Sequence, residues 1–137
     1  MNPDGRLQHI LEDELQRQVI GTKTKPGLAR IVGWRAYHTL RSKGSEAGYP
    51  DWSLFRERHL YIELKREQGV VSAAQREWLR AITQAGVEAY IVRPRNLQDI
   101  ATVLQARGPY ETWSHKAVQA RGALLLEVDE VIRTDKL

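Results

Sequence analysis

Residues 48–65, GYPDWSLFRERHLYIELK, are the most informative part of this chain. Two segments with alternating apolar side chains lie on either side of the polar run 56–59, which is the pattern of a β-hairpin. The polar run contains no Asn-Gly pair, so a two-residue turn is not required.

The apolar side chains fix the register of this hairpin. Leu60, Ile62 and Leu64 share one face of the second strand, because side chains alternate along a strand. Trp52 and Leu54 share a face of the first strand, and only one parity of pairing places them beside the other three. That parity requires a loop of three residues or of another odd number.

The same parity brings Asp51, Glu63 and Lys65 together on the opposite face. Two close carboxylates favour a hard divalent cation, Mg²⁺ or Mn²⁺, which lowers the pKa of a bound water and neutralises charge on a phosphate. Lysine can orient or deprotonate the attacking water, and the backbone carbonyl of Leu64 is a candidate further ligand. The trio therefore predicts metal-dependent phosphodiester cleavage, with an ordinary solvated hairpin face as the alternative.

Three motifs follow one another along the chain: Gly48-Tyr49-Pro50-Asp51, Glu63-Leu64-Lys65 and GVVSAAQ at 69–75. Together with Gly33-Trp34 before them and GVEAYIVR at 86–93 after them, this ordered set resembles the VRR-NUC group of the PD-(D/E)XK nuclease superfamily. The resemblance covers roughly residues 10–105. It implies that Asp51 and Glu63 are metal ligands and that Lys65 is the catalytic lysine.

The resemblance also implies a metal-binding acid in the first helix. Residues 6–20 carry apolar side chains at four-residue spacing and are predicted to form an amphipathic helix. The family pattern places the acid four residues before a glutamine, which selects Glu12 ahead of Gln16, with Glu14 as the alternate. Acids near a helix N-terminus also suit the helix dipole without any further role.

A glutamine in the helix after the hairpin is the remaining site residue that the resemblance implies, and Gln75 occupies that place. Ser72 and Gln75 also match a capping box, in which the two side chains satisfy each other's end amides. The predicted helix runs to about Ala85. The two roles would compete for one side chain, and the sequence leaves both open.

The segment GTKTKPG, residues 21–27, interrupts the first helix, whereas family members run almost unbroken into the Gly-Trp strand. We expect a basic inserted loop that either contacts phosphates or is only solvated, followed by a short helix to about Val32. The candidate DNA contacts of the chain are basic residues on this loop or near the site, and one histidine at a strand end. They are Lys23, Lys25, Arg66, Arg93 and His38.

A further strand is predicted at Val87–Val92, and a helix capped by Asn96 at about 97–106. The helix between Lys65 and this strand predicts a right-handed crossover to the neighbouring position in the sheet. The predicted fold class is therefore α/β. It is a restriction-endonuclease-like core with a mixed β-sheet flanked by helices, in the order α-β-β-β-α-β-α, plus a C-terminal helical extension.

The break at Gly108-Pro109 divides the chain into a nuclease domain, 1–107, and a C-terminal helical extension of the same domain, 108–137. The extension has a wide apolar side, which either folds back on the domain or packs on a second copy. We expect a homodimer, because cutting both strands of a duplex or branched substrate needs two sites.

Composition sets the remaining expectations. The net charge of +4 suits a polyanionic partner, and the absence of cysteine excludes disulfides and thiolate metal sites. No apolar run reaches the length of a membrane span and no secretory signal is visible, so we expect a cytoplasmic protein without a membrane partner. The sequence has no glycine-rich phosphate loop and no zinc spacing, and we expect no organic cofactor.

The resemblance implies a divalent-metal-dependent DNA endonuclease of phage or bacterial origin, acting on branched, Holliday-junction-like or duplex DNA. One alternative is a nuclease-fold protein that binds DNA without cutting it, although a pure binder would not need Asp51, Glu63 and Lys65 together. The other alternative is an RNA-directed nuclease.

Overall fold

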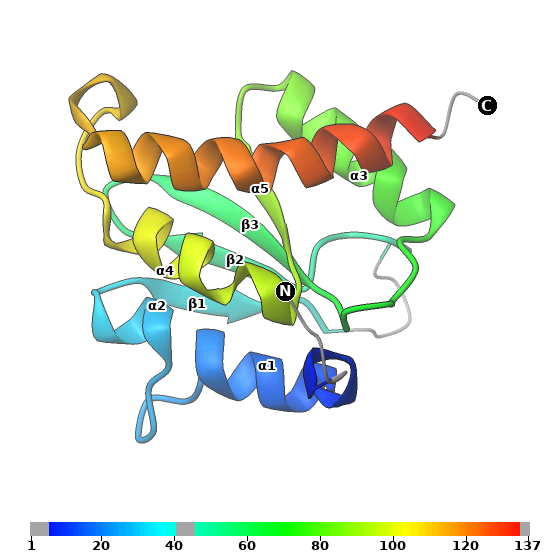
Figure 1. The fold of residues 1–137 in the computed structure, drawn as a ribbon, viewed down its shortest axis with the longest axis horizontal. Coiled ribbons are helices and arrows are strands. Elements are labelled where there is room, and N and C mark those ends of the chain that lie inside the picture. Colours follow the sequence, from blue (N-terminus) through cyan, green and yellow to red (C-terminus); the bar gives the residue numbers. More distant parts are fainter. Residues whose placement is uncertain (1–5, 41–45, 135–137) are drawn as a thin grey trace.

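In the part of the chain that the structure describes, residues 6–40 and 46–134, four strands form a mixed sheet in the order β1-β2-β3-β4 (Figure 1). The strands of this computed structural model are β1 (Arg35–His38), β2 (Trp52–Phe55), β3 (His59–Leu64) and β4 (Glu88–Val92). The helices are α1 (Glu12–Val19), α2 (Leu28–Ile31), α3 (Ala73–Gln84), α4 (Leu97–Gln105) and α5 (His115–Thr134), with short 3-10 helices η1 (Arg6–His9), η2 (Pro94–Asn96) and η3 (Tyr110–Thr112). The predicted α/β class and element order are confirmed. Within the described ranges, no helix combines the length and apolar character needed to cross a bilayer.

The hairpin of β2 and β3 has the predicted register. Trp52 pairs with Ile62 and Phe55 pairs with His59, so the connecting loop contains the three residues 56–58. β1 pairs antiparallel with β2, and β4 pairs parallel with β3 after the crossover through α3. The odd loop length that the apolar pattern required is therefore confirmed.

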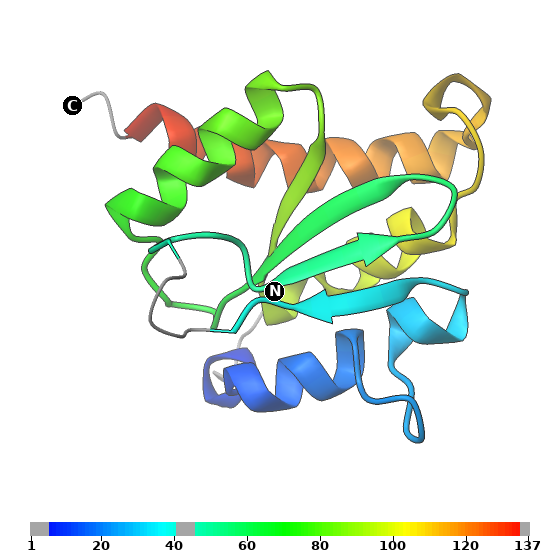
Figure 2. The same ribbon diagram turned by 180° about the vertical axis from the view of Figure 1, so that it is seen from behind.

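The two faces of the sheet are covered differently. The core face, which carries Leu54 and Ile62, packs against α1, α4 and α5. The opposite face, called the site face because it carries Asp51 and Glu63, packs against α3 through Leu79. Figure 2 shows that, among the described elements, no helix lies over the site face of β1 and β2.

The first helix is shorter than predicted. The expected helix over 6–20 is divided into η1 and α1, with Ile10 and Leu11 between them. Residues 21–27 form a tight loop closed by a bridge between Gly21 and Pro26. Gly21 has a φ of +64°, and a Cβ there would lie 2.3 Å from the carbonyl oxygen of Lys25, so this loop needs glycine at its start.

The C-terminal helix α5 folds back on the rest of the chain. Its residues Leu124 and Val128 are fully buried, the first in the cluster on the core face and the second in the cluster on the site face. The helix thus runs past β4 and contributes to both layers (Figure 1). Much of its apolar side is used within the chain, and dimerisation stays a prediction.

Two arginines in the hairpin loop bind the C-terminal end of α4. Arg56 donates to the carbonyl of Leu104 at 2.8 Å, and Arg58 donates to the carbonyl of Val103 at 2.9 Å. Both guanidinium groups also lie over the ring of Trp34. Positive charge at a helix C-terminus is favourable, so these contacts tie the hairpin to the helix layer.

Candidate active site

Asp51, directly before β2, and Glu63, on β3, lie beside each other. The backbone N–H of Asp51 donates to Oε1 of Glu63 at 3.3 Å, and the backbone N–H of Leu64 donates to Oδ2 of Asp51 at 3.4 Å. Glu63 is only 2% exposed, whereas Asp51 is half-buried. Each acid is therefore held by the backbone of the other strand.

The environment of Glu63 works against its negative charge. Burial first, and then the charge of Asp51, raise the pKa of Glu63 to about 9, although the positive charge of Lys65 opposes the shift. Glu63 therefore keeps a proton near pH 7 unless a further positive charge is supplied. The electrostatic interaction of all three side chains shows that the hairpin has brought them together.

Gln75 divides its side-chain amide between two partners. Its Oε1 accepts from the backbone N–H of Ser72 at 2.9 Å, while Oγ of Ser72 accepts from the backbone N–H of Gln75 at 3.1 Å, which completes the predicted capping box. Its Nε2 donates to Oε2 of Glu63 at 2.9 Å. The two ends of the amide thus have different partners, so the capping box does not prevent the contact with Glu63, and a catalytic role for Gln75 stays a prediction.

The loop before Asp51 lies directly against the N-terminus of α3. Gly48 has a φ of +88°, and a Cβ there would lie 2.4 Å from the carbonyl carbon of Ala74. The next residue, Tyr49, shares a hydrogen bond of 2.6 Å between its hydroxyl and that of Tyr61, and its ring meets Trp78 edge-on. Glycine at this position therefore permits the close approach that places the first acid beside α3.

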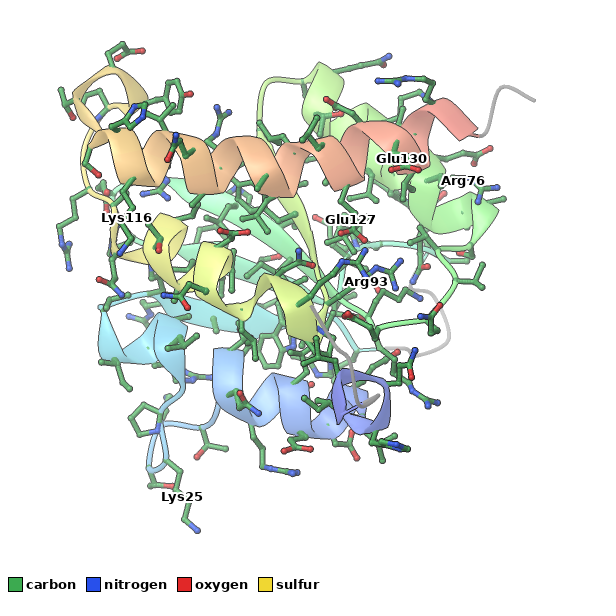
Figure 3. All side chains as sticks on the ribbon, viewed as in Figure 1. Lys25, Arg76, Arg93, Lys116, Glu127 and Glu130 are labelled. Carbon is green, nitrogen blue, oxygen red and sulfur yellow. The ribbon has the colours of Figure 1, made fainter. Side chains whose placement is uncertain are left out.

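Arg93 holds the turn that follows Lys65. Its guanidinium donates to the carbonyls of Arg66 at 2.7 Å and Gly69 at 2.8 Å, and its Nε donates to the carboxylate of Glu127 on α5. Arg93 and Glu127 lie together in Figure 3. Nothing in the sequence pointed to this role, since most of the partners are backbone carbonyls.

Comparison with protein-family models decides the family. The model described as the VRR-NUC domain matches residues 6–96, which is more than half of the chain. The chain belongs to the VRR-NUC family. The matched part of this VRR-NUC domain contains Asp51, Glu63, Lys65 and Gln75, and it ends before α4 and α5. No curated protein and no solved structure matches the chain.

The first-helix acids of this VRR-NUC domain do not form a metal-binding group with the hairpin acids in the part of the chain that the structure describes. Glu12 and Glu14 are exposed in the first turn of α1, where they suit the helix dipole. Across residues 6–40 and 46–134, no three Asp, Glu or His side chains gather into a group that could hold a metal ion. The structure therefore brings together the two hairpin acids, and a metal-binding role for Glu12 or Glu14 stays a prediction.

The five candidate DNA contacts do not gather at one place in the structure. Arg66 is exposed directly after the site lysine, whereas Lys23 and Lys25 are exposed on the loop after α1, and Lys25 points away from the body of the VRR-NUC domain (Figure 3). His38 pairs with Trp52 and stacks on its ring, which places it on the core face, opposite the acids. The roles of these four residues in binding DNA are still predictions.

Arg93 is the candidate that the structure accounts for in another way. The residue is 8% exposed, its Nη1 donates to the turn after Lys65, and its Nε donates to Glu127. Two of the three guanidinium nitrogens are therefore engaged within the protein, and Arg93 is not among the DNA contacts that we propose for the VRR-NUC domain.

The two hairpin acids suit a hard divalent cation. Carboxylate oxygens are the ligands that Mg²⁺ and Mn²⁺ prefer. Burial first, and then the charge of Asp51, raise the pKa of Glu63, and a bound cation would offset both effects. Asp51, Glu63 and the backbone carbonyl of Leu64 are the groups in this VRR-NUC domain that would hold the ion.

The stability of the metal-free VRR-NUC domain should fall as pH rises from about 4.5 to about 9. The pKa of Glu63 rises from the ordinary 4.5 to about 9 on folding, so the folded protein binds an extra proton within this window. The corresponding stabilisation is complete below the lower value and is lost as pH rises through the higher one. Melting temperatures measured in EDTA should decline across this range for the wild-type protein and decline less for Glu63→Gln. Equal pH slopes for the two proteins would contradict this assignment.

Proposed function

We propose that this protein is a divalent-metal-dependent DNA endonuclease that hydrolyses phosphodiester bonds. The observation that carries the proposal is the pair formed by Asp51 and Glu63, held by backbone hydrogen bonds across the hairpin with Lys65 beside them. Membership of a nuclease family supports the reaction type. The net charge of +4 supports a polyanionic substrate.

We assign each residue of the site a separate role in hydrolysis. Mg²⁺ or Mn²⁺ held by Asp51 and Glu63 would lower the pKa of a bound water and neutralise charge that develops on the phosphate. Lys65 supplies a positive charge on the same side and can orient or deprotonate the attacking water. Gln75 donates to one oxygen of Glu63 and so fixes the direction of that carboxylate, as partners of metal ligands commonly do.

We further propose that the enzyme is cytoplasmic, comes from a phage or bacterium, and selects branched or Holliday-junction-like DNA as a homodimer. Two cuts in a branched substrate need two sites, and a two-fold dimer supplies them. The proposed DNA contacts are Lys23, Lys25, Arg66 and His38.

A panel of substrates tests the proposal. Purified full-length protein is incubated with linear duplex, flapped, four-way and single-stranded DNA, and with RNA, in Mg²⁺, Mn²⁺ or EDTA. We expect cleavage of DNA in either metal and none in EDTA, with branched DNA cut faster than linear duplex. Binding without cleavage in either metal would show a DNA-binding protein, and cleavage of RNA alone would show an RNA-directed nuclease. Either result would refute the proposal.

Substitution of Gln75 and Ser72 separates the two roles of the glutamine. Gln75→Ala and Ser72→Ala each break the capping box and should each cost ~1 kcal/mol of stability. Only Gln75→Ala also removes the donor to Glu63, so its initial rate of cleavage should fall ~10–100-fold while that of Ser72→Ala changes little. Equal losses of rate in the two variants would mean that Gln75 acts through the helix cap alone.

A further inference from the structure

Beside the two acids, the site face carries four aromatic side chains on three adjacent strands. Phe55 pairs with His59, while Tyr37 and Tyr61 both pair with Ser53, so all four rings lie on one face of the sheet. They are called the aromatic row, and the register places them on the face that carries Asp51 and Glu63. Phe55 follows Asp51 by four residues along an extended segment, a distance of ~13 Å.

Part of the aromatic row is open to solvent. Tyr37 is 64% exposed and Phe55 is 45% exposed, in the region of the site face that lies outside α3 (Figure 2). Tyr61, on β3, is half-buried against α3, and its hydroxyl is hydrogen-bonded to that of Tyr49. The open part therefore adjoins the acids and is not closed by the described elements of the chain.

The rings are already ordered without a ligand. The rings of Phe55 and His59 stack with their centroids 4.4 Å apart and their planes at 9°. The ring centroids of His59 and Tyr61 are 4.6 Å apart. Burial lowers the pKa of His59, so its ring is neutral near pH 7 and packs as an apolar plate. The entropy cost of fixing the Phe55 ring is therefore incurred on folding, so a ligand that stacks on this ring does not have to immobilise it.

The charge around the aromatic row suits a polyanion. Arg35 pairs with Phe55 in the register and is exposed. Within the bounds of β1, β2 and β3, Glu63 is the one acidic side chain on the site face, and Asp51 lies beside it directly before β2. Aromatic rings combined with a cation are the features by which proteins hold single-stranded nucleic acid, because every base has a face that can stack.

We infer that the open part of the site face binds an unpaired DNA strand and leads it to the acids, with bases stacked on Tyr37 and Phe55 and a phosphate near Arg35. The inference rests on the proposed function and narrows its substrate to DNA with a single-stranded segment next to the cut. Bases inside a duplex are stacked on their neighbours and cannot use these rings.

Binding measured without metal tests this inference separately from cleavage. The full-length protein is titrated in EDTA against a fluorescein-labelled oligothymidylate and a labelled blunt duplex, and anisotropy is recorded. Tyr37→Ala and Phe55→Ala should each weaken single-strand binding about ten-fold or more, which is the usual size of a lost stacking contact, and change duplex binding little. The matched control is Ile31→Ala, an apolar residue 67% exposed on α2, which should bind both DNAs like the wild type.

Three outcomes would overturn the inference. The first is single-strand binding that is unchanged in both ring variants, and the second is an equal loss of binding to both DNAs. The third is conversion of a dimer to a monomer by Tyr37→Ala or Phe55→Ala with single-strand binding intact, which would make this face an interface between copies. A wild-type protein that never cleaves, but whose single-strand binding depends on these rings, would refute the proposed function and support the stacking surface.

Discussion

Asp51→Asn and Glu63→Gln should each lower the rate of DNA cleavage by ~10²–10³-fold without unfolding the protein. The two carboxylates are the groups that would hold the cation, and removal of a single charge-stabilising group in an active site commonly costs this much. The Glu63→Gln amide also needs no uptake of a proton on folding, so the metal-free variant should be at least as stable as the wild type near pH 8.

Initial rates in Mg²⁺ and melting curves in EDTA measure these two effects independently. The matched control is Glu57→Gln, which changes an acid in the hairpin loop that is bound by Arg56 at the end far from the site. It should cleave at close to the wild-type rate. Cleavage that survives both Asp51→Asn and Glu63→Gln would remove the hairpin acids from the mechanism.

Gly48→Ala should destabilise the protein by ~3 kcal/mol or more and should also reduce cleavage. Alanine at a φ of +88° is strained, and its Cβ would overlap the backbone of Ala74 at 2.4 Å. Relief of this overlap requires the loop to move away from α3, and that movement displaces Asp51 from its position beside Glu63.

Gly86→Ala is the control that separates the overlap from the backbone strain. Gly86 has a φ of +81°, close to that of Gly48, but a Cβ there would meet no atom within 4 Å. Its cost should be limited to the strain, ~1–2 kcal/mol, with cleavage retained. Urea unfolding and initial rates compare the two variants, and equal losses of stability would show that the approach of Gly48 to α3 carries no energetic weight.

The hairpin and its acids could be predicted because one physical requirement determined both. Apolar side chains of the two strands had to meet on one face, and the alternation of a strand then fixed the face on which Asp51 and Glu63 lie. The start of α3 could be predicted for a similar reason, because Ser72 and Gln75 form a cap from residues three positions apart.

Other features depend on contacts that a linear pattern does not contain. The four-residue spacing over 6–20 continues through Ile10 and Leu11, where the helix is in fact divided, so spacing alone could not locate the break. The face of His38 depends on the register of β1, which no turn or motif in the sequence specifies. A capping motif gives Gln75 one partner, whereas the fold gives a second partner to the other end of its amide.

The bond between Arg93 and Glu127 has a consequence for the size of the working unit. Glu127 lies on α5, beyond residue 96, where the similarity to the family ends. The turn after Lys65 is held by Arg93, and Arg93 is in turn held by Glu127, a residue outside the part of the chain that matches the family. A protein truncated after residue 96 would lose the bond to Glu127 and would expose apolar side chains of β4 to solvent. An engineered shorter form therefore has to retain α5.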